Sequence, residues 1–124
     1  MVTHKASRTC VTKEKFDFVD ITDDVQAAVT EAGIRTGRAT VFSPTDTCPI
    51  VVNERESGLL KDIRRAVDRV MDNGQKPAPT SIGSKSVVFP VVDGRLRLGT
   101  WQRLLLFELG DPEEHPVVVQ VVGE

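Results

Sequence analysis

The hydrophobic pattern of this chain is mostly that of β-strands. Ala6–Thr12 and Phe16–Ile21 are expected to form an opening pair of strands, joined by a polar turn. Further strands are predicted at Arg38–Ser43 and Ile50–Val52, separated by a loop that contains two prolines. The nearly all-valine segment Val117–Val122 predicts a final strand that is buried on both faces.

Two segments show helical periodicity instead. After Thr22, the expected N-cap, apolar residues recur three and four positions apart as far as Gly33, a residue typical of a helix end. Ser57 is the expected cap of a second helix, which carries an apolar stripe and ends at residues 72–74. The stretch 75–84 is rich in proline and serine and is expected to form a loop.

The segment 91–108 contains the most specific local signal. Asp93-Gly94 is a favoured two-residue hairpin turn, because both central positions of a type I′ turn need positive φ. Apolar residues precede the turn, and residues 95–98 alternate between arginine and leucine, as in a half-buried strand. The sequence therefore predicts a β-hairpin here.

The alternation continues beyond the hairpin and predicts that Thr100 and Gln102 point to one face of a strand and Trp101 to the other. A lone tryptophan in a strand is usually packed in a core or an interface, whereas Thr100 and Gln102 offer hydrogen bonds. We expect this trio to line a subunit interface or the wall of a site.

Short turns join most consecutive strands, which favours antiparallel over parallel pairing. We therefore predict an α+β fold, with an antiparallel, sandwich-like β core and two helices packed against it. The 124 residues are a common size for one domain and contain no linker long enough to divide them. Residues 1–124 are expected to form a single domain.

Charge and composition narrow the possible partners. The net charge of −2 and the pI near 5.7 provide no overall positive field for nucleic acid or an anionic membrane. No apolar run approaches the roughly 18 residues of a membrane span, and no signal-peptide pattern is present. We expect a cytoplasmic protein, in which Cys10 and Cys48 are buried free thiols in preference to a disulfide. The scarcity of asparagine fits a thermophilic source.

The string DGRLRLGTWQ, residues 93–102, closely resembles the C-terminal signature of the YjbQ-like family, whose members are described as secondary thiamine-phosphate synthases. Residues 42–54 resemble the family block that begins with Pro-His-Thr-Thr and ends with Asn-Glu, and the helix 59–71 resembles the helix after that block. The resemblance covers nearly the whole chain. It implies a compact homotrimer with sites near the subunit interfaces.

The chain also departs from the family pattern. Thr45 stands where the family has a histidine, and the shortened segment 75–84 lacks the family's further histidines. His4 and His115 lie outside every matching block. We therefore expect no cofactor and no metal site by the family's histidine route, since imidazole is the usual ligand of zinc-like ions. The candidate carboxylates alone would suit a hard cation at best: Asp46, Glu54 and Asp62.

Two carboxylates are candidate catalytic residues. Glu54 lies where the family places a site carboxylate and is a candidate general base or substrate anchor; the alternative is an ion pair with Arg64 or Arg65. Asp62 follows on the second helix and is a candidate partner of Glu54, although an acid on a solvated helix face is commoner.

The candidate substrate-binding residues are hydroxyl, carboxylate, amide and guanidinium groups that suit a phosphate-bearing ligand. Arg97 has a simple alternative as a surface partner of Glu108, and Cys48 is expected to be structural because no histidine is nearby to activate it. The set is Thr45, Asp46, Thr47, Arg95, Thr100 and Gln102.

By resemblance, the protein would join a pyrimidine pyrophosphate to a thiazole phosphate, or act on related phosphate-bearing metabolites. Because the family's histidines are missing, we expect that transferase activity to be very weak or absent. The alternative hypothesis is a non-catalytic trimer that binds a small anion or a protein partner.

Overall fold

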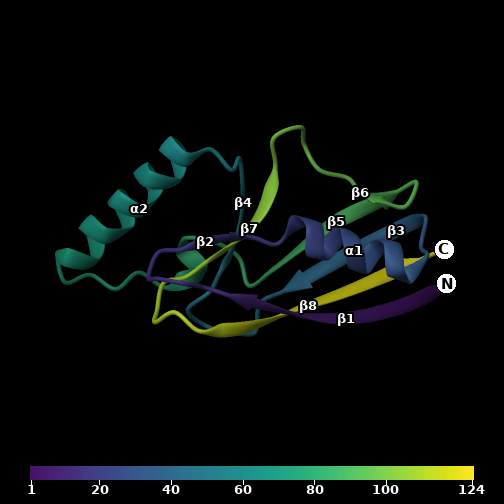
Figure 1. Ribbon diagram of the computed structural model, residues 1–124, viewed down its shortest axis with the longest axis horizontal. Helices are drawn as coiled ribbons and strands as arrows, with labels where there is room; N and C mark the ends of the chain where they lie inside the picture. Colours follow the sequence, from purple (N-terminus) through teal and green to yellow (C-terminus); the bar gives the residue numbers. More distant parts are fainter.

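The computed structural model describes residues 1–124, which form two antiparallel sheets and two α-helices (Figure 1). The larger sheet has the strand order β1-β8-β3-β5-β6 and the smaller one β2-β7-β4. The predicted α+β fold is confirmed. The larger sheet comprises β1 (Val2–Val11), β8 (Glu114–Gly123), β3 (Thr36–Phe42), β5 (Ser86–Val92) and β6 (Arg95–Leu96). The smaller sheet comprises β2 (Phe18–Asp20), β7 (Arg103–Phe107) and β4 (Ile50–Asn53).

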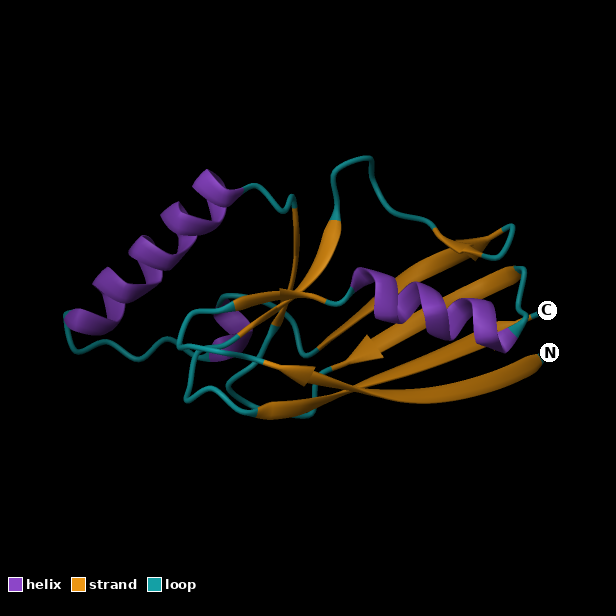
Figure 2. Ribbon diagram, in the orientation of Figure 1, coloured by secondary structure: helices purple, strands orange, loops and turns teal.

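The two helices differ in how they meet the sheets (Figure 2). Helix α1 (Thr22–Ala32) lies across one face of the larger sheet and contacts β1, β6 and β8. Helix α2 (Ser57–Asp72) lies at the other end of the molecule, where Leu60 is its one fully buried residue. A short 3₁₀ turn, Pro79–Ser81, lies within the predicted loop 75–84. Neither helix is long and apolar enough to cross a bilayer.

The main core lies between the larger sheet and the layer formed by α1 and the smaller sheet. Strand β8 contributes Val117, Val119 and Val121, all fully buried. The prediction that β8 is buried on both faces is wrong, because Val118 and Val122 point to the opposite face and are only half-buried. No second layer covers that outer face, so β8 shows the one-sided burial of an ordinary antiparallel strand.

Both predicted N-caps are displaced by one residue. Ile21 is the N-cap of α1, while the Thr22 hydroxyl accepts a hydrogen bond of 2.8 Å from the Leu104 backbone N–H. Glu56 is the N-cap of α2, and its carboxylate accepts hydrogen bonds from the first backbone N–H groups of that helix. These bonds lower the pKa of Glu56. The C-terminal stop at Gly33 is confirmed, with φ of 68° in the left-handed region.

The hairpin turn is confirmed, but the strand after it is shorter than predicted. Asp93 and Gly94 have φ of 52° and 77°, as a type I′ turn requires. Strand β6 ends at Leu96, and residues 97–102 form a loop that projects from the body (Figure 1). The prediction that Thr100 and Gln102 point to one face of a strand and Trp101 to the other is therefore wrong, because these residues are not in a strand. The side chain of Gln102 accepts a hydrogen bond from the Gly99 N–H, which closes this loop on itself.

Candidate functional site

The candidate site lies at the end of the smaller sheet and consists of two adjoining open grooves. We call the two together the Glu54 groove. Strands β4 and β7 pair with Asn53 opposite Arg103, so the residue after β4 lies beside the loop before β7. One groove of about 330 Å³ is bounded by residues 52–54 and 99–102, and the other, of about 390 Å³, by residues 54–56, 100, 101 and 103. Glu54, Thr100 and Trp101 line both.

Trp101 is the most unusual residue of the groove. Its side chain is 71% exposed, although it is the only tryptophan of the chain. An exposed indole on the wall of a groove provides an apolar face on which a planar ring can stack. Beside it, Glu54 is exposed and forms no ion pair with Arg64 or Arg65. Arg64 instead donates to the Phe16 carbonyl and lies over the Phe18 ring.

Two arginines of the groove are held in place by Asp20. Arg103 Nε donates to Asp20 Oδ2 at 2.7 Å, and an Arg55 guanidinium nitrogen lies 3.2 Å from the same oxygen. Burial alone would raise the pKa of Asp20, but hydrogen bonds from Thr22 and Arg103 hold it below its usual value. The anchored guanidinium groups keep further N–H donors for a ligand, because one arginine offers five.

The other predicted site residues lie elsewhere. Asp62 is exposed on α2 and lines neither part of the Glu54 groove. Arg95 lines a separate groove of about 360 Å³, between the end of α1 and the β5–β6 hairpin. Thr45, Asp46 and Thr47 precede β4, at the opposite end of that strand from Glu54, and Asp46 forms an ion pair with Lys85. The structure thus brings together Glu54, Thr100 and Gln102.

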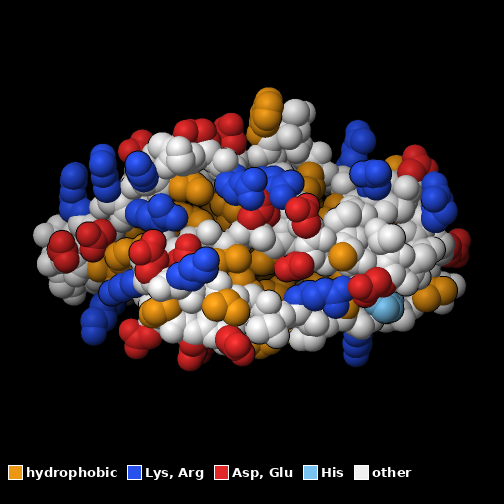
Figure 3. Space-filling view, viewed as in Figure 1, with side chains coloured by type: hydrophobic (Ala, Val, Ile, Leu, Met, Phe, Trp, Pro, Cys, Tyr) orange, Lys and Arg blue, Asp and Glu red, His pale blue; other side chains and the backbone are white.

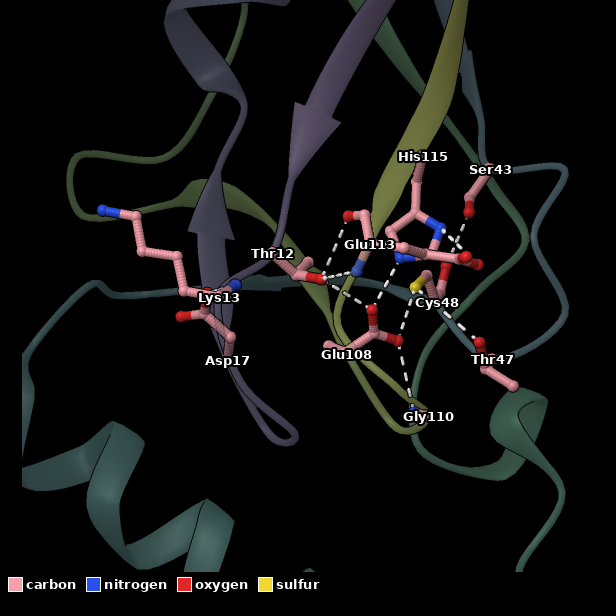
Figure 4. A network of polar contacts seen from close by, with 10 residues as sticks. All are labelled: Thr12, Lys13, Asp17, Ser43, Thr47, Cys48, Glu108, Gly110, Glu113 and His115. Atoms are coloured by element: carbon pink, nitrogen blue, oxygen red, sulfur yellow. Dashed lines mark hydrogen bonds and ion pairs between the residues drawn. The ribbon is translucent and has the colours of Figure 1, made fainter.

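A buried polar cluster, which the sequence did not suggest, lies beside the Thr47 loop (Figure 4). Glu108 directly follows β7 and is 0% exposed. One carboxylate oxygen, Oε1, lies 2.7 Å from the Thr12 hydroxyl and 2.6 Å from His115 Nε2. The other, Oε2, accepts from the Cys48 thiol at 3.0 Å and from the Gly110 N–H at 3.2 Å. The predicted surface pair of Arg97 with Glu108 is wrong.

The cluster changes the acidity of its members. Burial raises the pKa of the Cys48 thiol to about 12, and the neighbouring Glu108 carboxylate contributes to the rise. Burial alone would also raise the pKa of Glu108, but the hydrogen bonds from Thr12, Cys48, His115 and Gly110 together lower it. Cys48 is thus a protonated thiol at neutral pH, and the predicted state of two buried free cysteines is confirmed.

The sequence around each of these residues gives only a weak indication that they meet in the interior. Glu108 is a charged residue inside the apolar run 104–109, and His115 shares the inward alternation of the valines of β8. The partners of these residues come from distant segments, since 60 residues separate Cys48 from Glu108.

Comparison with known proteins agrees with the fold. The profile of the family described as UPF0047 protein YjbQ-like matches residues 7–124. A UPF0047 protein of Archaeoglobus fulgidus is 34% identical over 126 residues, which cover 92% of this chain and 98% of the relative. The UPF0047 protein YugU of Bacillus subtilis is 30% identical over 125 residues, which cover 90% and 94%.

Solved structures show the same architecture. A YbjQ-like protein of unknown function from Sulfolobus solfataricus superimposes with a TM-score of 0.89 at 31% identity, over 99% of each chain. A conserved protein from Clostridium acetobutylicum gives a TM-score of 0.86 at 29% identity, over 94% of this chain and 99% of the other. The resemblance predicted from the DGRLRLGTWQ segment is confirmed, and the chain belongs to the UPF0047 protein YjbQ-like family.

Proposed function

We propose that the Glu54 groove binds a phosphate-bearing metabolite with a planar nitrogen heterocycle, the type of compound used in thiamine phosphate synthesis. The observation that carries this proposal is the exposed face of Trp101 beside a free carboxylate and two anchored arginines. The indole face would stack on the ring. Glu54 would accept a hydrogen bond from a ring amino group, and Arg55 would donate to the phosphate.

The arrangement favours binding over rapid catalysis. Glu54 is exposed, and the second candidate acid, Asp62, lies outside the groove. The only hydroxyl side chain of the groove is that of Thr100, and no lysine or histidine lines the groove to activate it. Thr45 also replaces the histidine of the family pattern. We therefore propose very weak or absent thiamine-phosphate synthase activity on a retained ligand site.

Ligand binding can be measured directly, because Trp101 is the only tryptophan and the chain has no tyrosine. We expect thiamine phosphate or the pyrimidine pyrophosphate to change the intrinsic fluorescence and to raise the melting temperature. Loss of the stacking face in Trp101→Ala, followed by calorimetry, should weaken binding about tenfold, the effect of roughly 1.4 kcal/mol. Glu54→Gln should weaken binding of the aminopyrimidine compound and leave that of inorganic phosphate unchanged.

Asp62→Asn and Arg95→Ala serve as matched controls, since both residues lie outside the groove. Binding that is equally weakened by these controls would contradict the assignment of the groove. So would the absence of any fluorescence or thermal response to all three compounds. Formation of thiamine phosphate is measured separately, with and without Mg²⁺, and fast turnover under either condition would overturn the weak-activity proposal.

We further propose that the outer face of the larger sheet is the contact surface of a homotrimer. Cross-strand pairing places Phe42 next to Val118, Val88 next to Thr40, and Val122 next to Arg38 on this face. Phe42 is 40% and Val88 57% exposed. By contrast, basic and acidic side chains lie close together across the middle of the face shown in Figure 3. An apolar sheet face favours association with further copies of the chain.

A charge on the outer face should therefore dissociate the trimer. We expect light scattering coupled to gel filtration to give a trimer mass for the wild type and a monomer mass for Val88→Glu. The matched control is Val70→Glu, because Val70 is an exposed valine on α2, away from the larger sheet. A monomeric wild type at micromolar concentration, or a trimeric Val88→Glu variant, would contradict the proposal.

A further inference from the structure

Three side chains of different metal-ligating types converge inside the protein, apart from the Glu54 groove. Cys48 and Glu108 are 0% exposed and His115 is 1% exposed. Their ligand atoms all lie within 4.8 Å of one another, and Figure 4 shows the three side chains pointing toward one another. We propose that Cys48, Glu108 and His115 form a binding site for one zinc-like divalent ion.

The separations of these atoms are close to those of a tetrahedral site. Cys48 Sγ lies 3.0 Å from Glu108 Oε2, and His115 Nε2 lies 2.6 Å from Oε1. With Zn–S of about 2.3 Å and Zn–N or Zn–O of about 2.0–2.1 Å, two ligands of one tetrahedral ion are roughly 3.3–3.6 Å apart. Both observed separations are shorter, so the carboxylate would have to move away from the thiol and the imidazole by less than about 1 Å to admit the ion.

The donor set selects the class of metal. A thiolate, an imidazole and a carboxylate together suit zinc and similar transition ions, whereas calcium and magnesium take oxygen ligands. On binding, the Sγ–H bond of Cys48 breaks, the sulfur bonds to the metal and the proton passes to solvent. The proton that His115 Nε2 donates to Glu108 would move to Nδ1, the neutral tautomer that leaves Nε2 free to bond to the metal. The fourth position would be filled by a hydroxyl or a single water molecule, and the Thr12 and Thr47 hydroxyls both lie in the cluster.

The surroundings also fit a metal site. The other ring nitrogen of His115, Nδ1, lies 3.9 Å from a Glu113 carboxylate oxygen. In zinc sites a carboxylate often accepts a hydrogen bond from the ring nitrogen that does not bind the metal, and this bond orients the ring. A small movement of the Glu113 side chain would place its carboxylate in that role. The Ser43 hydroxyl donates to the Cys48 carbonyl at 2.6 Å and fixes the backbone of that ligand. The metal would join three segments: the loop before β4, the end of β7 and the start of β8.

Burial of all three ligands indicates a structural role, because a substrate cannot reach the ion. The hydrogen bonds within the cluster also satisfy these groups without metal, so the metal-free chain is expected to fold. This makes metal binding measurable as a separate event. The site does not follow the family's histidine pattern, which is why the sequence led us to expect none.

The chain contains two cysteines and two histidines, so each proposed ligand has a matched control of the same type. Reduced, chelator-treated full-length protein is exposed to zinc in the folded state and, in parallel, during refolding from guanidinium. After desalting, we expect one zinc per chain and a raised melting temperature. Cys48→Ala and His115→Gln should each bind zinc at least tenfold more weakly, whereas Cys10→Ala and His4→Gln should bind like the wild type.

Cobalt provides a readout that does not depend on the stability of the variants. A thiolate-to-cobalt charge-transfer band in the wild type that persists in Cys10→Ala identifies Cys48 as the ligand, even where Cys48→Ala does not fold. Absence of retained zinc in both the folded and the refolded wild type would overturn the proposal. Equal zinc binding by wild type and Cys48→Ala would overturn it as well, because it would place the ion on surface groups.

Discussion

Replacement of Glu108 with alanine is expected to lower the free energy of unfolding by about 3–5 kcal/mol, the cost of removing one partner of a buried charged network. The carboxylate accepts hydrogen bonds from Thr12, Cys48, His115 and Gly110. Without it, the buried Cys48 thiol and His115 ring would lose this acceptor inside the protein, where water cannot replace it. Urea denaturation at a fixed protein concentration measures the change.

The neighbouring Glu113 provides the control. Its side chain is 68% exposed and lies 3.9 Å from His115, so Glu113→Ala removes a carboxylate of the same region without opening the buried network. We expect no more than a small change in stability for that variant. Comparable losses in Glu108→Ala and Glu113→Ala would show that the buried network does not contribute as argued.

The Glu108 carboxylate also makes the stability of the protein depend on pH in the acid range. Its pKa in the folded protein is below the ordinary value of 4.5, so the unfolded chain binds its proton more readily. The stability that Glu108 contributes is therefore complete above about pH 4.5 and is lost as the pH falls through the lower folded value. Glu108→Gln, compared with the wild type between pH 6 and pH 3, should show a shallower loss of stability.

Replacement of Gly37 with alanine is expected to cost about 3 kcal/mol or more, because overpacking against backbone atoms cannot be relieved by a side-chain rotation. Gly37 lies on β3 opposite Gly123 of β8. A Cβ at this position would overlap the Val122 carbonyl oxygen and would lie 2.8 Å from the Gly123 Cα. The two central strands of the larger sheet would have to separate.

Gly33→Ala is the matched control for this prediction. Gly33 has φ of 68°, and a Cβ there would have no atom within 4 Å. Alanine at this helix end should cost only about 1–2 kcal/mol, the cost of a left-handed conformation for a residue with a Cβ. Chemical denaturation of both variants separates the two effects, and a Gly37→Ala cost no larger than that of Gly33→Ala would contradict the steric argument.

Features that depend on neighbouring residues could be predicted from the sequence. The positive φ of Asp93 and Gly94 and the helix stop at Gly33 follow from short-range preferences. The cap of α1 was displaced because a tertiary contact competed with a local one, whereas in α2 the Glu56 carboxylate provides the cap one residue earlier. The Thr22 hydroxyl bonds the Leu104 N–H, 82 residues away, and so does not cap its own helix.

The candidate site could be predicted only in part, because loop positions depend on strand pairing. Pairing of β4 with β7 brings Glu54 to Thr100 and Gln102, but it leaves Thr45 at the far end of β4. Asp62 and Arg95 lie on surfaces that face other grooves or solvent. Residues that a motif groups together can thus be separated by the geometry of the sheets.

By itself, the sequence determined the positions of the strands, the helices and the hairpin turn, because periodicity and turn preferences act over a few residues. It also determined the family, because the GTWQ segment is specific to it. The tertiary structure alone decided that Trp101 stands in an exposed loop and that Cys48, Glu108 and His115 meet in the interior. Such contacts join residues that are far apart in the chain. Their formation depends on which strands pair and in what order, and this is decided by packing between distant segments.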